Sequence, residues 1–365
     1  MKKIIVCVTS DLATDNRVDK VCTTLHNMGF EVMLVGRRLG DSPSLAPRPY
    51  VAKRMRLLFT RGFLFYTEYN IRLFFLLLFN RGNLILANDL DTLPSAFFAS
   101  KLKGKPLIYD SHEYYTEAPE LIDHRKIKRF WQRLEKYMIP KVNAAYTVCH
   151  SIADVYSQLY HIPFRVVRNV PHSANSKLTG VDIPAKKPFI IYQGVLNVGR
   201  GLEETIRAMQ FLPEASLLIA GSGSIEKELR TLAETLPVKN IFFSGRILFD
   251  ELRLITPHAS LGISLEKDLG LNYHFALPNK LFDYIQAEIP VVVSNLPEMK
   301  RVVNEYNIGL IASSHNAEKL AETLRKALFD ESLRKPWLQN LKTAAAELTW
   351  ENEEKIVREI FEPYL

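Results

Sequence analysis

The chain has 365 residues, which is too long for one comfortable core and about right for two domains. Hydrophobic residues make up 47% and charged residues 24%, a composition typical of a folded protein that excludes a largely disordered chain. The formal net charge of +7 is compatible with nucleic acid, an anionic membrane surface or a phosphorylated ligand. The cysteines form no C-x-x-C pair, so we expect neither a disulfide framework nor a structural zinc site, and we expect a reducing compartment.

Two stretches bear on targeting and membrane insertion. The N-terminus has the basic start of a signal peptide, but its apolar run covers only residues 4–8, so we predict a first buried strand there. The longest apolar run, 71–79, falls short of the roughly 18 to 20 residues of a spanning helix and contains Arg72. We therefore expect no transmembrane segment and a cytoplasmic location.

The first half alternates β-branched runs with segments of helical periodicity. Residues 3–10 and 31–36 flank a stretch with apolar residues at helical spacing, which is the pattern of a βαβ unit and predicts a parallel sheet. We assign residues 1–172 to this first α/β domain. Further strands are predicted in it at 83–89, 106–113, 144–149 and 164–169.

A polar segment separates this half from a second alternating series. Residues 171–187 are rich in Pro and Ser and lack periodicity, so we predict a linker at 173–187 and a second domain at 188–345. A final helix is predicted within 346–365. The strands of the second domain are predicted at 188–195, 216–222, 241–245, 260–265, 290–294 and 309–313.

The expected fold class is α/β, with two Rossmann-like, doubly wound parallel-sheet domains. Ligands of such sheets bind outside the carboxyl ends of the strands, so we expect both domains to face a central cleft. No recognition motif accompanies the positive charge, and we expect no nucleic-acid partner.

A glycine-rich turn of the second half is a candidate phosphate site. Gly194 to Gly201 lie between a strand and a helix, where backbone N–H groups favour an anion and Arg200 adds a cation. A plain turn with a solvated arginine is equally compatible with this spacing. Gly221 and Gly223 form a shorter pattern that favours a turn over a phosphate loop.

The stretch 278–283 places a turn before a short helix. Pro278 and Asn279 predict the turn, and Lys280 and Asp283 are spaced to share one helix edge. This pair could hold a diphosphate and ribose hydroxyls. By the residues alone, an exposed ion pair worth a few tenths of a kcal/mol is the simpler interpretation.

Candidate cleft residues of the first half follow its first strand. Asp15, Asn16 and Arg17 lie there at the predicted cleft edge, where they could contact a ligand. An N-cap role for Asp15 or Asn16 is about equally compatible with the sequence.

Two later strands of this half also end in polar residues. Asp110, His112 and Glu113 follow one of them and are candidates to face the cleft, although a lone histidine is more often structural. Asp89 belongs to an Asp-Leu-Asp stretch that resembles a metal motif only superficially. We predict a loop there, with Asp89 capping or facing the cleft, and no metal.

The segment 53–81 combines basic residues with Phe, Leu and Tyr. Such a segment can lie peripherally in the interface of an anionic membrane. The alternative is one or two core helices whose arginines extend to solvent.

Several of these stretches together resemble a known family. The residues "YQGVL", "RGLEETIRAM", "LLIAGSG", "LPNKLFDYIQAEIPVVVSN" and "LTWENEEKI" are similar to the nucleotide-sugar domain of glycosyltransferase family 4, which has the GT-B fold. In the first half, "ANDLDTLPSA" and "YDSHEYYTEAPEL" resemble a bacterial subgroup of that family. The resemblance implies an acceptor-binding first domain, a donor-binding second domain and a final helix that returns to the first domain.

The resemblance also implies roles for individual residues. Asp283 matches the second acid of the E-x7-E motif, which holds the donor ribose, and Arg200 matches a residue that contacts the diphosphate. Lys280 matches a lysine of a P-x-K variant, with a phosphate role. His112 matches a histidine that approaches the transferred sugar.

The chain departs from the family pattern at three further positions. Phe275 stands where the first acid of E-x7-E is expected, and Val195 stands where many relatives carry an arginine. Glu288 replaces a glycine, which implies a changed turn because Glu disfavours positive φ.

The implied activity is retaining transfer of a sugar from a nucleotide-diphosphate-sugar to a glycan or lipid-linked acceptor, in bacterial surface polysaccharide or glycolipid synthesis. It implies no cofactor and no metal, and a location in the cytoplasm or at the inner membrane face. Phe275 and Val195 leave an alternative, which is a catalytically weak nucleotide-sugar-binding or scaffold protein.

Overall fold

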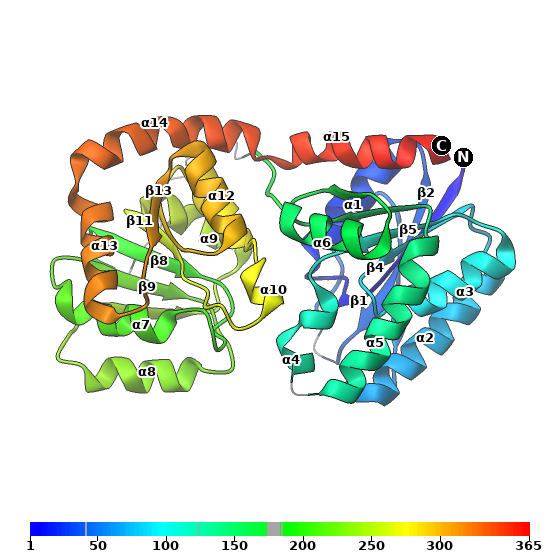
Figure 1. Cartoon of the computed structure of the whole chain (residues 1–365), viewed down its shortest axis with the longest axis horizontal. Helices are drawn as coiled ribbons and strands as arrows, with labels where there is room; N and C mark the ends of the chain where they lie inside the picture. The colour runs from blue at the N-terminus through cyan, green and yellow to red at the C-terminus, as the bar shows by residue number, and fades with distance from the viewer. Residues whose placement is uncertain (41, 123, 174–182, 184) are drawn as a thin grey trace. The chain divides into compact units, whose positions relative to one another are not determined.

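The computed structural model describes residues 1–40, 42–122, 124–173, 183 and 185–365 (Figure 1). The chain divides into two compact units. The N-terminal unit comprises 1–169 and 352–365, and the C-terminal unit comprises 170–351. Of the predicted linker, 173–187, residues 174–182 and 184 lie outside the described residues.

The N-terminal unit is built on a seven-stranded sheet in the order β3-β2-β1-β4-β5-β6-β7, with parallel pairing between neighbours. The strand order reverses between β1 and β4, which is where ligands bind in doubly wound sheets. Burial on both faces explains the continuous apolar runs of β4 and β5. The strands are β1 Lys3–Asp11, β2 Glu31–Arg38, β3 Val51–Arg56, β4 Leu84–Asn88, β5 Leu107–Ser111, β6 Ala144–Thr147 and β7 Phe164–Val166.

Helices of this unit connect the strands, and two short 3-10 turns, η1 Tyr115–Glu117 and η2 Ile139–Lys141, accompany them. The predicted α/β alternation is confirmed, with strand ends within a few residues of the predicted ones. The helices are α1 Asn16–Asn27, α2 Gly62–Phe79, α3 Leu93–Lys103, α4 Pro119–Ile122, α5 Arg125–Met138 and α6 His150–Tyr160.

The segment 53–81 is not helical throughout, because its first residues belong to strand β3 and helix α2 starts only at Gly62. Helix α2 packs on α3 and buries one stripe of side chains four residues apart, namely Phe65, Tyr69, Leu73 and Leu77. Among the described helices α2 alone is long and apolar enough to cross a membrane by length and composition. Core helices of soluble proteins pass the same criterion, so this property does not establish a span.

The C-terminal unit contains a six-stranded sheet in the order β10-β9-β8-β11-β12-β13, also with parallel pairing between neighbours. Its order reverses between β8 and β11. All predicted strands of this half are confirmed. They are β8 Phe189–Gln193, β9 Ser216–Ala220, β10 Ile241–Gly245, β11 Leu261–Ser264, β12 Val291–Ser294 and β13 Gly309–Ala312.

Two clusters of buried apolar side chains hold the helices of this unit to its sheet. One contains Leu202, Ile206 and Leu320, and the other contains Leu281, Ile285 and Met299. The helices are α7 Leu202–Ala208, α8 Glu226–Thr235, α9 Phe249–Ile255, α10 Leu271–His274, α11 Asn279–Gln286, α12 Pro297–Tyr306, α13 Ala317–Phe329 and α14 Glu331–Glu347, with 3-10 turns η3 Met209–Phe211 and η4 Thr256–His258.

Glu288 follows α11 and adopts φ +54, the left-handed conformation. The turn before β12 therefore keeps the backbone conformation that glycine adopts without cost. The glutamate stores strain of about 1–2 kcal/mol there.

The last helix, α15 Trp350–Phe361, is followed by η5 Glu362–Tyr364, and residues 352–365 belong to the N-terminal unit. The ring of Phe361 lies 6.3 Å from that of Tyr146 on β6. The carboxylate of Glu353, which is 1% exposed, accepts hydrogen bonds from the backbone N and the Nε of Arg168, both at 2.7 Å. The tail is thus fixed to the first sheet by both packing and charge.

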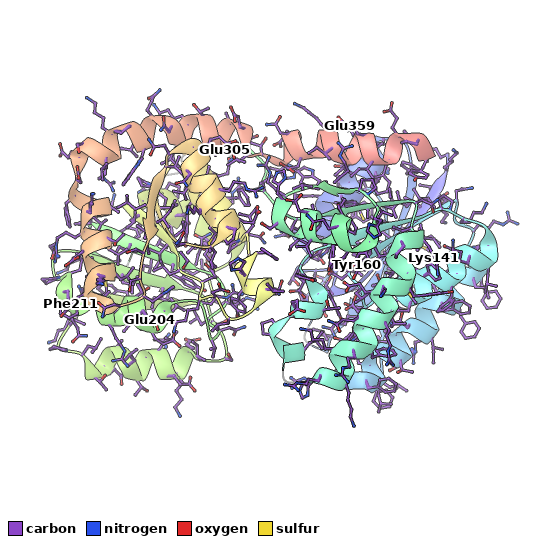
Figure 2. All side chains as sticks on the ribbon, viewed as in Figure 1. Lys141, Tyr160, Glu204, Phe211, Glu305 and Glu359 are labelled. Carbon is purple, nitrogen blue, oxygen red and sulfur yellow. The ribbon has the colours of Figure 1, made fainter. Side chains whose placement is uncertain are left out.

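Replacing Glu353 with Ala should lower the free energy of unfolding of the N-terminal unit by about 2–4 kcal/mol, because it leaves the Arg168 N–H and guanidinium without their acceptor. Urea unfolding followed by circular dichroism measures this. Glu359→Ala on the same helix is the control, since the Glu359–Arg165 pair is exposed and worth less than about 1 kcal/mol (Figure 2). Equal effects of the two substitutions would show that Glu353 does not anchor the tail.

Candidate functional site

The carboxyl ends of β1, β4 and β5 gather polar residues at one edge of the N-terminal sheet. Asp89 follows β4 directly, and Asp110 and His112 lie at the end of β5. Because β4 and β5 pair in parallel register, with Asn88 opposite Asp110, these side chains meet. The sheet thus brings together three of the residues predicted to face the cleft.

His112 lies between two carboxylates. Its Nδ1 is 3.2 Å from Asp89 Oδ2, and its Nε2 is 3.1 Å from Asp110 Oδ2 and 3.2 Å from Asn88 Oδ1. Burial alone would lower its pKa, but Asp89 and Asp110 outweigh burial and raise the pKa of His112 to about 9. The ring is therefore an imidazolium at neutral pH, and both of its nitrogens donate to protein groups.

Asp89 supports this arrangement through its backbone. It adopts φ +60, and its Oδ1 accepts a hydrogen bond of 2.8 Å from the His112 backbone N. Asp89 thus forms a tight loop, as predicted, and orients the histidine.

Arg17 and Asp110 are buried inside the N-terminal unit, whereas the sequence predicted them at the edge of a cleft. Arg17 is 4% exposed and Asp110 is fully buried. The Arg17 Nη2 lies 2.8 Å from Asp110 Oδ1, and its Nη1 donates to the Val167 carbonyl at 2.8 Å. Although burial opposes ionisation, Arg17 and His112 hold the pKa of Asp110 below its ordinary value. Both side chains are buried and paired with each other, and the contact of Arg17 or Asp110 with a ligand stays a prediction.

The other predicted residues of this edge have separate positions. Asp15 is the N-cap of α1, with its Oδ1 accepting from the Val18 N–H, as the alternative interpretation held. Asn16 is exposed, and Glu113 is half-buried.

Asp91 was not among the predicted site residues. Its Oδ2 accepts a hydrogen bond of 2.6 Å from Thr9 Oγ1, while its Oδ1 is buried without a hydrogen-bond partner among the described residues. Burial and the nearby Asp89 raise the pKa of Asp91 to about 7. The Asp-Leu-Asp stretch could have identified Asp91 from the sequence, but its spacing resembled only a metal motif. No cluster of three metal-ligating side chains occurs among the described residues.

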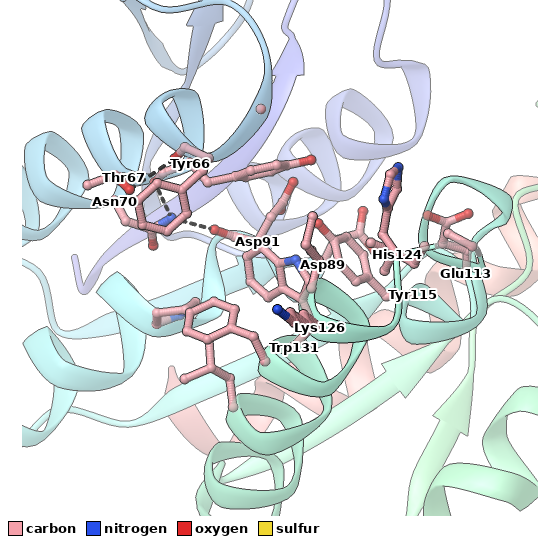
Figure 3. Close-up of a pocket in the computed structure, with 18 residues that line it drawn as sticks. Tyr66, Thr67, Asn70, Asp89, Asp91, Glu113, Tyr115, His124, Lys126 and Trp131 are labelled. Carbon is pink, nitrogen blue, oxygen red and sulfur yellow. Dashed lines mark hydrogen bonds between the residues drawn. The ribbon is translucent and has the colours of Figure 1, made fainter.

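A cavity of about 1080 Å³ lies within the N-terminal unit beside this edge (Figure 3). Its walls come from α2, α5 and the η1–α4 segment, and Asp89, Asp91 and Glu113 line one part of it. Figure 3 shows Asp91 between Tyr66 and Trp131. The rest of the lining is predominantly apolar.

The charge on His112 predicts a pH dependence of stability. Its folded pKa, about 9, exceeds the ordinary value of 6.5, so its contribution to stability is full below pH 6.5 and is lost as the pH rises to about 9. The loss should be on the order of 2–3 kcal/mol. Urea unfolding at pH 6 and pH 9.5 measures it, and His112→Gln should remove most of the difference. A His112 resonance that titrates near pH 6.5 by NMR would contradict the assignment.

In the C-terminal unit the turn after β8 runs from Gly194 to Gly201. Gly201 adopts φ +70 before α7, and a Cβ there would lie 2.2 Å from the Leu265 carbonyl oxygen. A Cβ on Gly221 would lie 1.8 Å from the Gly194 oxygen, and one on Gly223 2.3 Å from the Leu196 oxygen. Close backbone packing therefore accounts for these glycines, which favours the turn interpretation of Gly221 and Gly223.

Lys280 and Arg200 meet at Glu266, a carboxylate that sequence analysis missed. Lys280 Nζ is 2.6 Å and Arg200 Nη1 is 3.5 Å from Glu266 Oε1, and Ser264 Oγ donates to Oε2 at 2.8 Å. Glu266 is fully buried, which opposes its ionisation, but Lys280, Ser264 and Arg200 together keep its pKa below the ordinary value. Glu266 lies two residues after the end of β11, where the strand order reverses between β8 and β11. This position could have identified it as a site residue from the sequence.

Lys280 differs from the exposed helix-edge lysine that the spacing suggested. It is 9% exposed, it pairs with Glu266, and its Nζ lies 4.6 Å from the centre of the Tyr192 ring. A Cβ on Gly194 would lie 3.5 Å from Lys280 Cε, so the lysine runs beside the turn after β8. The predicted residues Gly194, Arg200 and Lys280 are thus neighbours, although 80 positions separate Arg200 from Lys280.

Asp283 is half-buried, and its Oδ2 accepts a hydrogen bond of 2.9 Å from Gln193 Nε2 at the end of β8. The Gln193 Oε1 in turn accepts from Thr256 Oγ1 at 2.9 Å. This relay fixes Asp283 at the carboxyl end of β8, on the same edge as Lys280. Asn279 is the exposed first residue of α11, and Val195 is 56% exposed in the turn.

Two doubly wound parallel-sheet domains in one chain are the architecture of the GT-B glycosyltransferase fold. Residues 15–175 match the family described as Glycosyltransferase Family 4, and residues 177–344 match the family described as Glycosyl transferases group 1. The chain therefore belongs to the group 1 glycosyltransferases of family 4, which confirms the resemblance inferred from the motifs.

The individual relatives share little sequence identity with this chain. The chain is 31% identical over 150 residues to the lipopolysaccharide glucosyltransferase WaaG of Escherichia coli strain K12, a match that spans 39% of this chain and only 37% of that protein. The sucrose-phosphate synthase of Thermosynechococcus elongatus is similar in structure, with a TM-score of 0.79, 16% identity and coverage of 100% and 99% of the two chains. HepE of Anabaena, solved in complex with UDP-glucose, is also similar in structure. Its TM-score is 0.75, its sequence identity is 13%, and the match covers 100% of both chains. These structural likenesses show the fold.

Proposed function

We propose that the protein is a retaining, metal-independent glycosyltransferase. It transfers a sugar from a nucleotide-diphosphate-sugar to a glycan or lipid-linked acceptor in the synthesis of a bacterial surface polysaccharide or glycolipid. The observation that carries this proposal is the cluster of Lys280, Arg200 and Glu266 beside Asp283 at the switch point of the C-terminal sheet. Family membership and the fold shared with a UDP-glucose-binding protein support it.

Two parts of this cluster bind different groups of the donor: the cations bind the diphosphate, and Asp283 binds the ribose. Lys280 and Arg200 supply two positive charges against the single negative charge of Glu266, so the cluster retains attraction for a diphosphate. Asp283 offers carboxylate oxygens to a pair of ribose hydroxyls while Gln193 holds it in place. Glu266 is a positioning residue, because it restricts the rotamers of both cations before the donor arrives.

The chemical step needs mainly that the reactants are held in position and that cations stabilise the leaving diphosphate. In a retaining transfer the leaving diphosphate can assist the incoming hydroxyl from the same face, so the cations that stabilise the departing phosphate lower the barrier. His112 carries a fixed positive charge and has both ring nitrogens engaged by Asp89, Asp110 and Asn88. We infer that it acts electrostatically and not as a general base.

The first test is a thermal-shift comparison of UDP-, GDP- and ADP-sugars with a CMP-sugar, which lacks the diphosphate. One of the diphosphate donors should raise the melting temperature, because it binds only the folded state. Asp283→Ala should weaken that donor at least tenfold, whereas Asp268→Ala, which removes an exposed carboxylate of the same unit, should not. The absence of any response to nucleotide-sugars would overturn the transferase proposal.

Phe275 favours one alternative. It is half-buried at the end of α10, where the family pattern would place an acid against the sugar. A protein that binds the donor without using it would fit this feature and would be a scaffold. Release of nucleoside diphosphate in the presence of a cell-envelope lipid extract distinguishes the two, since a scaffold gives a thermal shift without turnover.

We further propose that helices α2 and α3 contact an anionic membrane. Both helices carry exposed apolar side chains, which we together call the α2–α3 face, and Arg61, Arg72 and Arg81 are exposed close to them in sequence. Apolar area combined with basic residues favours binding at the interface of an anionic bilayer. The face consists of Phe63, Leu64, Ile71, Phe75, Phe79, Phe98 and Leu102.

Pelleting with phosphatidylglycerol vesicles tests this contact. Phe75→Ser with Phe79→Ser should reduce the bound fraction severalfold, because both rings are at least half exposed and would enter the bilayer. Phe329→Ser is the matched control, since it removes an exposed phenyl group, 45% accessible, from the C-terminal unit. Equal binding to phosphatidylcholine vesicles, or no effect of the double substitution, would argue against the proposal.

A further inference from the structure

The cavity of the N-terminal unit has two chemically distinct parts. Its wall is formed by aromatic and aliphatic side chains of α2, η1 and α5, and acids that follow β4 and β5 line the rest. A volume of about 1080 Å³ exceeds what one sugar ring occupies and lies at the upper limit of small-molecule pockets, about 1,000 Å³. A ligand complementary to this lining combines an apolar portion with a polar one.

The apolar wall is organised around Trp131, which is 5% exposed. Its indole contacts the ring of Tyr66 edge-on at 5.4 Å and that of Tyr115 at 5.5 Å. These contacts fix a rigid surface that a hydrocarbon chain can cover without reorganising the protein.

The rim of the cavity is exposed and apolar. Phe63 is 74% exposed, Ile127 48% and Phe130 49%, and all three line the cavity. Phe63 also belongs to the α2–α3 face, so the cavity and the face that we propose to contact lipid share this residue. The exposed residues Arg125 and Arg129 at the start of α5 add positive charge beside this rim.

The polar part contains a carboxylate oxygen that lacks a donor. Asp91 is 6% exposed, and its Oδ1 makes no hydrogen bond within the described part of the chain, although its Oδ2 is satisfied by Thr9. A buried acceptor left unpaired is costly, so a ligand group that donates a hydrogen bond gains that free energy when it binds. Hydroxyls of a sugar head group are such donors.

We propose that this cavity binds a glycolipid acceptor, with its hydrocarbon chain between α2 and α5 and a sugar hydroxyl donating to Asp91 Oδ1. The inference rests on the proposed function and deepens it, because it selects a lipid-linked acceptor over a free glycan and assigns it a site. Asp91 thereby orients the head group at the edge of the sheet that holds His112.

The test uses methyl, hexyl and octyl β-D-glucosides as probes, each below its micelle-forming concentration, with affinity measured by isothermal titration calorimetry. Each buried methylene should tighten binding about fourfold, so octyl glucoside should bind on the order of 15-fold more tightly than hexyl glucoside. Methyl glucoside should bind weakly. Affinities independent of chain length would overturn the proposal.

Substitutions locate the binding. Thr67→Trp places an indole in the cavity from α2 and should weaken octyl glucoside at least tenfold, whereas Gln132→Trp, at an exposed position of α5 outside the lining, should not. Asp91→Asn should weaken hexyl and octyl glucoside by a similar factor, about five- to tenfold, and leave their ratio unchanged. Binding that is indifferent to Thr67→Trp would place the site elsewhere and refute the assignment.

Folding of each variant is checked by circular dichroism. If Thr67→Trp does not fold, Phe130→Ser at the exposed rim serves instead, and it should weaken octyl glucoside about threefold or more without changing methyl glucoside. A thermal shift with the nucleotide-sugar is recorded on the same preparations. A donor response without glucoside binding would refute only the cavity assignment, and glucoside binding without a donor response would refute only the transferase proposal.

Discussion

Each unit of this protein contains a fully buried carboxylate at the carboxyl ends of its parallel strands. Two cationic side chains bind this carboxylate. In the N-terminal unit Asp110 is held by Arg17 and His112, and in the C-terminal unit Glu266 is held by Lys280 and Arg200. A carboxylate cannot remain ionised in the interior without such partners. The partners come from distant parts of the chain, so these two clusters fix the loops that surround them.

Removing one member of such a cluster is costly, but a well-packed apolar replacement of the whole cluster need not be, because desolvation offsets much of the Coulombic attraction. Their value is in orientation. Arg17 ties α1 to β5 and to the Val167 carbonyl, and Glu266 fixes two cations that would otherwise sample many rotamers. The same charges set protonation states, since the acids around His112 keep it protonated and the cations around Glu266 keep it ionised. A site prepared in this way needs little reorganisation when an anionic ligand arrives.

The local departures from the family pattern have different consequences. At Glu288 the backbone keeps its left-handed turn despite the side chain, so the fold overrides the residue preference. At Phe275 and Val195 the side chains themselves have changed, and no backbone adjustment replaces a missing charge. The cations that meet at the edge of the C-terminal sheet are Lys280 and Arg200, with Glu266 as their common partner.

The sequence alone determined the alternating α/β pattern, most strand positions and the family, because periodicity and motif order are local properties of the chain. It did not predict β3, where the basic residues of 53–56 suggested helices, nor helix α14. Only the tertiary structure decided which charges pair. Arg17 and Asp110 are 93 positions apart, and Lys280 and Glu266 belong to different elements, so no spacing rule connects them. Asp91 and the aromatic wall of the cavity likewise meet only when α5 packs beside α2, because burial and hydrogen-bond satisfaction are properties of the folded chain.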